Sequence, residues 1–157
     1  MATETERKFL LRDQRYKSLA VRHYDIVQAW LFDTQGKTLR VRIRDNEAFL
    51  TFKGPSTQDG VERFEWEKAI PLEEARELMR FCLPGKIEKT RYLVPQDGFV
   101  FEVDEFHGDN EGLVVAELEL PSADSPYPRP DWLGREVTGD KRYYNVMLGR
   151  QPYKTWK

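Results

Sequence analysis

The sequence predicts an α+β fold in which an eight-stranded antiparallel sheet closes into a barrel, with flanking helices and a C-terminal helix. Eight segments alternate apolar and polar side chains, as strands with one buried face do. Short turns rich in Gly, Asn and Asp join most of them and favour antiparallel neighbours. A chain of 157 residues can bury roughly 70% of its unfolded surface, so we expect a single domain over residues 1–157.

The predicted strands follow one another in an order that occurs twice. A strand, a helix and three strands span residues 3–53, and the same series spans residues 62–120. This repeat suggests an internal duplication. The strands are expected at residues 3–11, 25–32, 38–44, 48–53, 62–70, 86–94, 99–106 and 113–120.

Three helices are predicted from cap residues, prolines and glycines at their ends. The first helix would be capped by Asp13 and end at Leu19, the second would begin at Pro71 and end before Pro84-Gly85, and the third would run from its cap Asp140 to Leu148, stopped by Gly149. The second helix has an apolar face that includes Cys82, so we expect a buried thiol there.

Charged side chains recur at every second position of several predicted strands. In an extended chain such residues share one face and lie about 7 Å apart. Either these charges face water around an apolar core, or they line the inside of the barrel while helices cover its apolar outside. The runs are Glu4, Glu6 and Lys8; Arg40, Arg42 and Arg44; Arg63, Glu65 and Glu67; and Glu117 and Glu119.

Three observations favour the charged interior. Like charges repeat at positions i and i+2 of one strand, which brings no gain on a merely solvated face. The opposite faces of these strands are apolar and could be covered by helices. The charges also sort by sign into acidic and basic strands, as a site for a cation and an anion requires. Because a charged interior is costly unless a ligand or metal neutralises it, the pattern points to phosphate chemistry beside a metal ion.

The overall composition argues against several other functions. The formal net charge is −2 although 33% of the residues are charged, whereas a protein that coats nucleic acid carries a basic excess. No apolar run approaches the ~18 residues of a membrane span, and the N-terminus does not resemble a signal peptide. A lone cysteine is typical of a reducing compartment. We therefore expect a cytoplasmic protein without nucleic-acid or membrane partners.

Eight sequence motifs, in a fixed order along nearly the whole chain, resemble those of the CYTH family, also called triphosphate tunnel metalloenzymes. The resemblance implies an eight-stranded antiparallel tunnel that binds triphosphate groups together with a divalent metal. The motifs are Glu4-x-Glu6-x-Lys8, Arg40-Val41-Arg42, Thr51-Phe52-Lys53, Arg63-x-Glu65-x-Glu67, Glu88-Lys89-Thr90-Arg91-Tyr92, Glu102-Val103-Asp104, Ala116-Glu117-Leu118-Glu119 and Asp140-Lys141-Arg142-Tyr143-Tyr144-Asn145.

The resemblance also implies roles for individual residues. The metal-binding carboxylates would be Glu4, Glu6, Glu117 and Glu119. Such an all-oxygen donor set fits Mg²⁺ or Mn²⁺, and His23 and His107 fall outside the motifs. Catalysis would involve Glu4, Glu6 and Lys8. The phosphate-binding cations would be Lys8, Arg40, Arg42, Lys53, Arg63, Lys89 and Arg91, with Lys141 or Arg142 reaching in from the last helix. Supporting acids would be Glu65, Glu67, Glu102 and Asp104.

One position departs from the family pattern. Many members carry Gln-Gly-Tyr-Leu on the second strand, where this chain has Gln28-Ala29-Trp30-Leu31. An indole N–H can donate a hydrogen bond but can neither accept one nor ionise, so a mechanism that depends on the tyrosine hydroxyl is in doubt. Trp30 would either pack in the barrel or stack on the ligand.

The predicted activity is metal-dependent hydrolysis of a small-molecule triphosphate, most like that of the small inorganic triphosphatases. One alternative is a class IV-type adenylate cyclase, which would use the same tunnel with a ribose hydroxyl as the nucleophile. A second alternative is a polyphosphate- or nucleotide-binding module that turns nothing over. The sequence leaves open the physiological triphosphate and whether the protein forms a homodimer.

Overall fold

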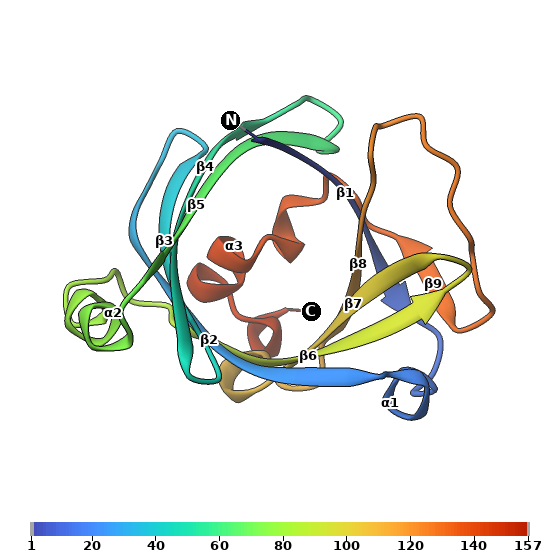
Figure 1. Cartoon of the computed structure of the whole chain (residues 1–157), viewed down its shortest axis with the longest axis horizontal. Coiled ribbons are helices and arrows are strands. Elements are labelled where there is room, and N and C mark those ends of the chain that lie inside the picture. Colours follow the sequence, from blue (N-terminus) through green and yellow to red (C-terminus); the bar gives the residue numbers. More distant parts are fainter. Residues whose placement is uncertain (1, 157) are drawn as a thin grey trace.

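The computed structural model describes residues 2–156 and shows a closed antiparallel barrel (Figure 1). Its strands are β1 (Ala2–Leu11), β2 (Arg22–Thr34), β3 (Lys37–Arg44), β4 (Glu47–Ser56), β5 (Glu62–Ile70), β6 (Ile87–Gln96), β7 (Phe99–Phe106) and β8 (Val114–Glu119). Neighbouring strands follow the order β5-β4-β3-β2-β6-β7-β8-β1, and β1 pairs with β5 to close the ring. The predicted eight-stranded barrel is confirmed.

A ninth strand, β9 (Leu133–Glu136), lies outside this ring and was not predicted. Residues 2–5 of β1 pair with β5, and β9 pairs with β1 farther along, at Phe9 and Leu11. β9 has only four residues, which is too short for an alternating pattern to stand out. It follows a proline-rich segment that we expected to be irregular.

The predicted repeat of elements is present in the connectivity of the barrel. The series β1, α1 (Tyr16–Leu19), β2, β3 and β4 is followed by β5, α2 (Leu72–Met79), β6, β7 and β8. In the ring, β1, β2, β3 and β4 occupy places equivalent to those of β5, β6, β7 and β8. For example, β3 lies between β2 and β4 just as β7 lies between β6 and β8. The two halves therefore offer corresponding positions that can be compared directly.

The first two helices occur close to where they were predicted. α2 starts directly after Pro71, packs its buried Ala75 against the outside of β3 and β4, and leaves Cys82 only partly buried beside that cluster. The N-cap of α1 is Arg15, so the prediction of Asp13 is wrong: Asp13 instead accepts hydrogen bonds from the backbone and guanidinium of Arg15. No helix within residues 2–156 is long and apolar enough to cross a membrane.

The predicted C-terminal helix is interrupted. Asp140 caps the 3₁₀ turn η2 (Lys141–Tyr143), Tyr144 is extended, and α3 (Asn145–Arg150) begins after it. Gly149 lies inside α3 and does not stop it. A Cβ at Gly149 would stand 2.4 Å from the backbone oxygen of Gly85, so a glycine is required here for close packing. Two further 3₁₀ turns are η1 (Gly108–Asn110) and η3 (Tyr153–Thr155).

The apolar faces of the strands point outward, and most of them are covered by other elements, although Trp66 of β5 is 44% exposed. Phe9, Phe101 and Leu118 are at most 1% exposed, and they pack with Tyr16 of α1 and Trp132 from the segment before β9. α2 covers β2, β3 and β4 in the same way. The charged faces of these strands therefore point into the barrel, which decides between the two arrangements that the alternation allowed.

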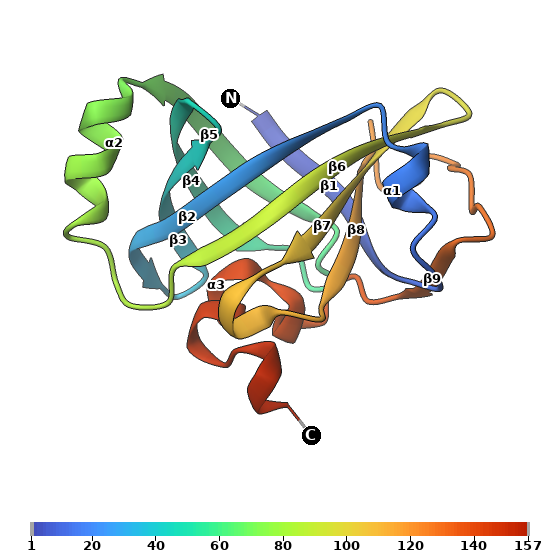
Figure 2. The same cartoon turned by 90° about the horizontal axis from the view of Figure 1, so that it is seen from below.

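The C-terminal segment closes one end of the barrel. Figures 1 and 2 show α3 lying across that end. Tyr143 and Leu148 join an apolar cluster with Trp30 of β2. This packing places Tyr144 and Asn145 against the interior of the barrel.

Candidate functional site

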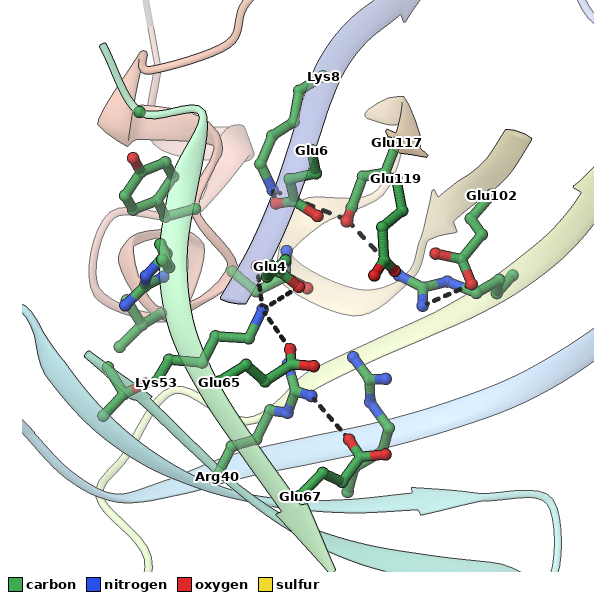
Figure 3. A pocket seen from close by; sticks show the side chains of 18 of the residues that line it. Glu4, Glu6, Lys8, Arg40, Lys53, Glu65, Glu67, Glu102, Glu117 and Glu119 are labelled. Carbon is green, nitrogen blue, oxygen red and sulfur yellow. Dashed lines mark hydrogen bonds and ion pairs between the residues drawn. The ribbon is translucent and has the colours of Figure 1, made fainter. Parts of the chain in front are cut away.

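A cavity of about 240 Å³ lies inside the barrel, and Figure 3 shows the side chains that project into it. Its lining is predominantly charged. Most of the predicted site residues come together here: Glu4, Glu6, Lys8, Arg40, Arg42, Lys53, Arg63, Glu65, Glu67, Lys89, Arg91, Glu102, Glu117 and Glu119.

Two predicted site residues lie elsewhere. Asp104 is 1% exposed and sits behind the cavity wall, where it contacts cations that do line it. Lys141 is exposed on η2, and its neighbour Arg142 pairs with Asp140. Neither Lys141 nor Arg142 lines the cavity, because the break at Tyr144 turns the chain inward only after η2.

Three residues at the site were not assigned a role from the sequence. Tyr144 places its ring 5.7 Å from Lys8 Nζ and 5.7 Å from the Arg63 guanidinium carbon. Asn145 lines the cavity, and Gln28 is fully buried beside it. These side chains carry no formal charge, so the charge pattern gave no signal for them. The available signal was their place in two motifs, Gln28-Ala29-Trp30-Leu31 and the segment from Asp140 to Asn145.

β1 and β8 form the acidic side of the cavity. Their pairing places Glu6 opposite Glu119. Lys8 stands opposite Glu117 on the same face, and Glu4 lies two residues before Glu6. The Nζ atom of Lys8 is 3.3 Å from Glu6 and 3.7 Å from Glu117. The Lys8 ammonium thus lies between two of these carboxylates.

Burial and neighbouring charges shift the pKa values of these carboxylates in opposite directions. Burial and the nearby Glu117 raise the pKa of Glu6 to about 7. Burial also raises the pKa of Glu119. For Glu117, burial alone would raise the pKa, but Lys8 and Arg91 outweigh it and hold that pKa well below its usual range. At neutral pH Glu117 is therefore ionised while Glu6 is partly protonated.

The donor chemistry of the cavity suits a hard cation. Among residues 2–156, no three His, Cys, Asp or Glu side chains are already gathered at the spacing of metal ligands. Lys53 instead donates to both Glu4 oxygens at 3.0 Å and lies 3.5 Å from Glu65. Neither histidine nor cysteine is found among the described lining residues, so the available donors are carboxylate oxygens, which Mg²⁺ and Mn²⁺ prefer.

β3 supplies a basic side across the cavity. Arg40 donates to Thr51 at 3.3 Å and lies 3.9 Å from Glu67. Arg42 donates its Nε–H to Gln28 Oε1 at 2.8 Å. Burial and the neighbouring guanidinium of Arg40 lower the pKa of Arg42 to about 9. An anion beside Arg42 would stabilise the charged guanidinium and raise this pKa again.

Asp104 anchors two more cations on β6. It accepts hydrogen bonds from Lys89 at 2.7 Å and from Arg91 at 2.7 and 2.9 Å. Burial would raise the pKa of Asp104, but Arg91 and Lys89 hold it below its usual value. Burial lowers the pKa of Lys89 to about 7, and the neighbouring Arg91 adds to that shift. Asp104 thus orients two cations toward the cavity without lining it.

Comparisons with known proteins agree with this architecture. The model of a family described as the CYTH domain matches residues 2–144. The chain belongs to the CYTH family. This CYTH protein is 46% identical over 158 residues to a protein of Acetivibrio thermocellus named inorganic triphosphatase, covering 100% of this chain and 99% of the relative.

Two further relatives carry the same description. A Nitrosomonas europaea protein named inorganic triphosphatase is 36% identical over 154 residues, covering 93% of this chain and 96% of the relative. A crystal structure of an inorganic triphosphatase matches this CYTH protein with a TM-score of 0.65 and 33% identity, covering 95% of each chain. Membership of a family of triphosphate tunnel metalloenzymes implies a divalent metal ion.

Proposed function

We propose that this CYTH protein is a divalent-metal-dependent hydrolase of a small-molecule triphosphate, with inorganic tripolyphosphate as the first candidate. The observation that carries this proposal is the closed barrel whose interior sets the acidic side on β1 and β8 beside the basic side on β3 and β6. Two nearly full-length relatives named inorganic triphosphatase support it.

The basic side would bind the phosphate oxygens. Arginine guanidinium groups donate to phosphate through two parallel N–H groups, and lysine contributes a compact charge. The residues proposed for this role are Lys8, Arg40, Arg42, Lys53, Arg63, Lys89 and Arg91. Glu65, Glu67, Glu102 and Asp104 would hold these cations in place, as the ion pairs Lys53–Glu65, Arg40–Glu67 and Arg91–Glu102 suggest.

The acidic side would hold the divalent ion. We assign this role to Glu4, Glu6, Glu117 and Glu119, and we propose Mg²⁺ or Mn²⁺ because the donors are oxygen atoms only. When bound there, the ion supplies positive charge to the phosphate oxygens. Burial and the neighbouring Glu117 raise the pKa of Glu6 to about 7, and an added positive charge beside these carboxylates would favour their ionised form.

Hydrolysis joins a water oxygen to the terminal phosphorus and breaks that phosphorus's bond to its bridging oxygen. With tripolyphosphate the leaving group is pyrophosphate, and the second product is inorganic phosphate. We assign to Glu4 and Glu6 the orientation of the water and the acceptance of its proton, for which a pKa of Glu6 near neutrality is suited. Lys8, 3.3 Å from Glu6, would stabilise the charge that develops on the phosphate oxygens.

The activity can be tested by a phosphate-release screen with the purified chain. Tripolyphosphate, nucleoside triphosphates and thiamine triphosphate are each incubated with Mg²⁺ or Mn²⁺, and with EDTA as the control. We expect release from at least one triphosphate that requires the metal. Product analysis with ATP separates hydrolysis from cyclisation. Tight binding of every triphosphate without any release would support a binding module and contradict the proposal.

We further propose that the protein acts in the cytoplasm. Cys82 is a free thiol, which is typical of a reducing compartment. Fractionation of cells that produce the chain, followed by detection of the protein in each fraction, checks this location. Recovery with a membrane fraction or outside the cell would contradict it.

A further inference from the structure

At the end of the cavity closed by α3, two neutral amides join two cations. Asn145 Oδ1 accepts hydrogen bonds from Gln28 Nε2 and from Lys89 Nζ, both at 2.8 Å. Gln28 Oε1 in turn accepts from Arg42 Nε at 2.8 Å. The four side chains form a continuous hydrogen-bonded series across β3, β2, α3 and β6. We call Gln28 and Asn145 together the amide bridge.

The two cations fix the orientation of both amides. A lysine ammonium and an arginine guanidinium can only donate, so the amide atoms that face Lys89 and Arg42 must be oxygens. The nitrogen of Gln28 then faces the oxygen of Asn145, as observed. Among residues 2–156 no acceptor takes the two N–H groups of Asn145, whose side chain lines the cavity. These donors are available to a ligand.

The bridge holds Arg42 without neutralising it. Lys8, Lys53 and Arg91 each contact at least one carboxylate. Within the described chain, Arg42 makes its hydrogen bond to a neutral amide and forms no ion pair with a carboxylate. Its terminal N–H groups therefore keep their full capacity for an anion. Lys89 uses two of its three N–H groups on Asp104 and Asn145, which leaves one.

The fold limits what these donors can bind. Tyr144 and Val146 line the cavity on either side of Asn145, and α3 lies across this end of the barrel (Figure 2). Because α3 packs across this end through Tyr143 and Leu148, we expect a group held here to be the end of a chain of phosphates. An organic substituent on that phosphate would meet the closed end.

We propose that Gln28 and Asn145 are positioning residues that hold Arg42 and Lys89 around one terminal, unsubstituted phosphate group, to which Asn145 also donates an amide N–H. This inference rests on the proposed function for the identity of the ligand. It predicts that the amide bridge contributes to the binding of tripolyphosphate whether or not a metal is present.

The test compares variants of the amide bridge with a matched buried amide outside the cavity, Asn110 of η1. Asn145→Ala and Gln28→Ala remove the two halves of the bridge, and the double variant removes both. Asn110→Ala is the control, because Asn110 is also buried but bonds only the backbone of Leu148 and Tyr153, outside the cavity. Tripolyphosphate binding is measured by calorimetry in EDTA, and KM and kcat are measured with Mg²⁺.

We expect each bridge variant to weaken tripolyphosphate binding about tenfold, since losing a hydrogen bond to a charged group changes binding by roughly that factor. KM should rise similarly while kcat changes less. The double variant should lose less than the product of the two single effects, because both residues act in one series. Asn110→Ala should lower the unfolding temperature but leave binding within about twofold.

A second substitution keeps the test valid if Asn145→Ala does not fold. Asn145→Asp preserves shape and both acceptor contacts but adds a negative charge, so the chain should fold while tripolyphosphate binding in EDTA falls at least about tenfold. Unchanged binding by the bridge variants would overturn the inference. Equal weakening by Asn110→Ala, or a wild type that does not bind tripolyphosphate in EDTA, would overturn it too.

The two proposals can fail separately. If the wild type binds tripolyphosphate in EDTA through the amide bridge but never releases phosphate with metal, the proposed hydrolysis is wrong and the inference stands. If the wild type hydrolyses tripolyphosphate and the bridge variants bind and react like it, the proposed function stands and the inference is wrong.

Discussion

The two halves of the barrel share one strand order, but their equivalent strands β3 and β7 carry opposite charges. β3 in the first half presents Arg40 and Arg42 to the cavity side, whereas β7 in the second half presents Glu102 and Asp104. The pairing of β3 with β4 corresponds to that of β7 with β8, so the comparison is between strands in equivalent places of the ring. The scaffold is repeated, while the charge is inverted.

This inversion teaches how a barrel can tolerate a charged interior. Each half brings charges of both signs into the cavity, because burying like charges alone would carry a large penalty. β6 belongs to the second half and pairs with β2 of the first, and its Arg91 contacts both Asp104 and Glu117 of its own half. Ion pairs such as Lys8–Glu6, Lys53–Glu4 and Arg91–Glu117 satisfy many of these charges in the absence of ligand. A metal ion and a polyanion would then replace these internal partners.

The largest expected effect comes from neutralising the buried acid of the second half. Asp104 bonds Lys89 and Arg91 and is 1% exposed, so Asp104→Asn leaves two cations without their shared partner. We expect the free energy of unfolding in urea to fall by about 3–5 kcal/mol. Tripolyphosphate should restore part of this loss, because a bound polyanion supplies the missing negative charge.

A matched control for this variant is Asp109→Asn. Asp109 pairs with Lys154 at the surface, and both side chains are more than half exposed. Its removal should change the free energy of unfolding by less than about 1 kcal/mol. If Asp104→Asn were as harmless as this control, the buried carboxylate of β7 would not be holding the two cations of β6 in place.

The next effect concerns activity. Glu117→Gln keeps the size of the side chain but removes the carboxylate that contacts Lys8 and Arg91. We expect the rate of tripolyphosphate hydrolysis to fall more than about 100-fold, beyond the 10–100-fold typical of groups that only support a metal ligand. The exposed Glu111→Gln is the control for charge alone. A Glu117→Gln enzyme with wild-type kcat would show that Glu117 takes no part in hydrolysis.

Much of this comparison was visible in the sequence, because strands expose alternate residues on one face. The repeat of elements, the inward direction of Arg42 and the placement of Glu117 in the cavity all follow from a period of two and from the sorting of charge. The resemblance to a known family supplied the individual roles that periodicity cannot assign.

The remaining features depend on contacts between segments distant in the chain. The break at Tyr144 is set by how the C-terminal segment packs into the barrel end, which no local pattern encodes. Gly149 was mistaken for a helix stop because the sequence does not show that Gly85 lies against it. Asn145 and Gln28 are neutral, so their link between two cations appears only once the strands are closed into a ring.

A smaller effect is expected on the basic side. Arg40→Gln removes a buried guanidinium that lines the cavity near Thr51. We expect KM for tripolyphosphate to rise about tenfold, the usual cost of one hydrogen bond to a charged group, with a smaller change in kcat. Arg80→Gln, at an exposed position on the outside, should leave both constants unchanged. A loss confined to kcat would place Arg40 in the chemical step instead of in binding.

The smallest effect is a pH dependence of stability in EDTA. The pKa of Glu6 is raised to about 7, from 4.5, by burial and Glu117, and that of Glu65 is raised to about 7 by burial and Glu4. The folded state therefore holds more protons than the unfolded state between these values, and stability must fall as the pH rises through that window. Glu117 does not offset this, because its lowered pKa keeps it ionised throughout.

Thermal unfolding in EDTA should therefore give a lower midpoint at about pH 7 than at about pH 5.5. Added Mg²⁺ should raise the midpoint more at the higher pH, because protons no longer compete with it for Glu6. Glu6→Gln should make the profile less steep without abolishing it, since the amide cannot titrate while Glu65 still does. A midpoint that rises across this window in EDTA would show that burial and the neighbouring carboxylates do not raise the pKa values of Glu6 and Glu65, which would contradict the electrostatic account of the cavity.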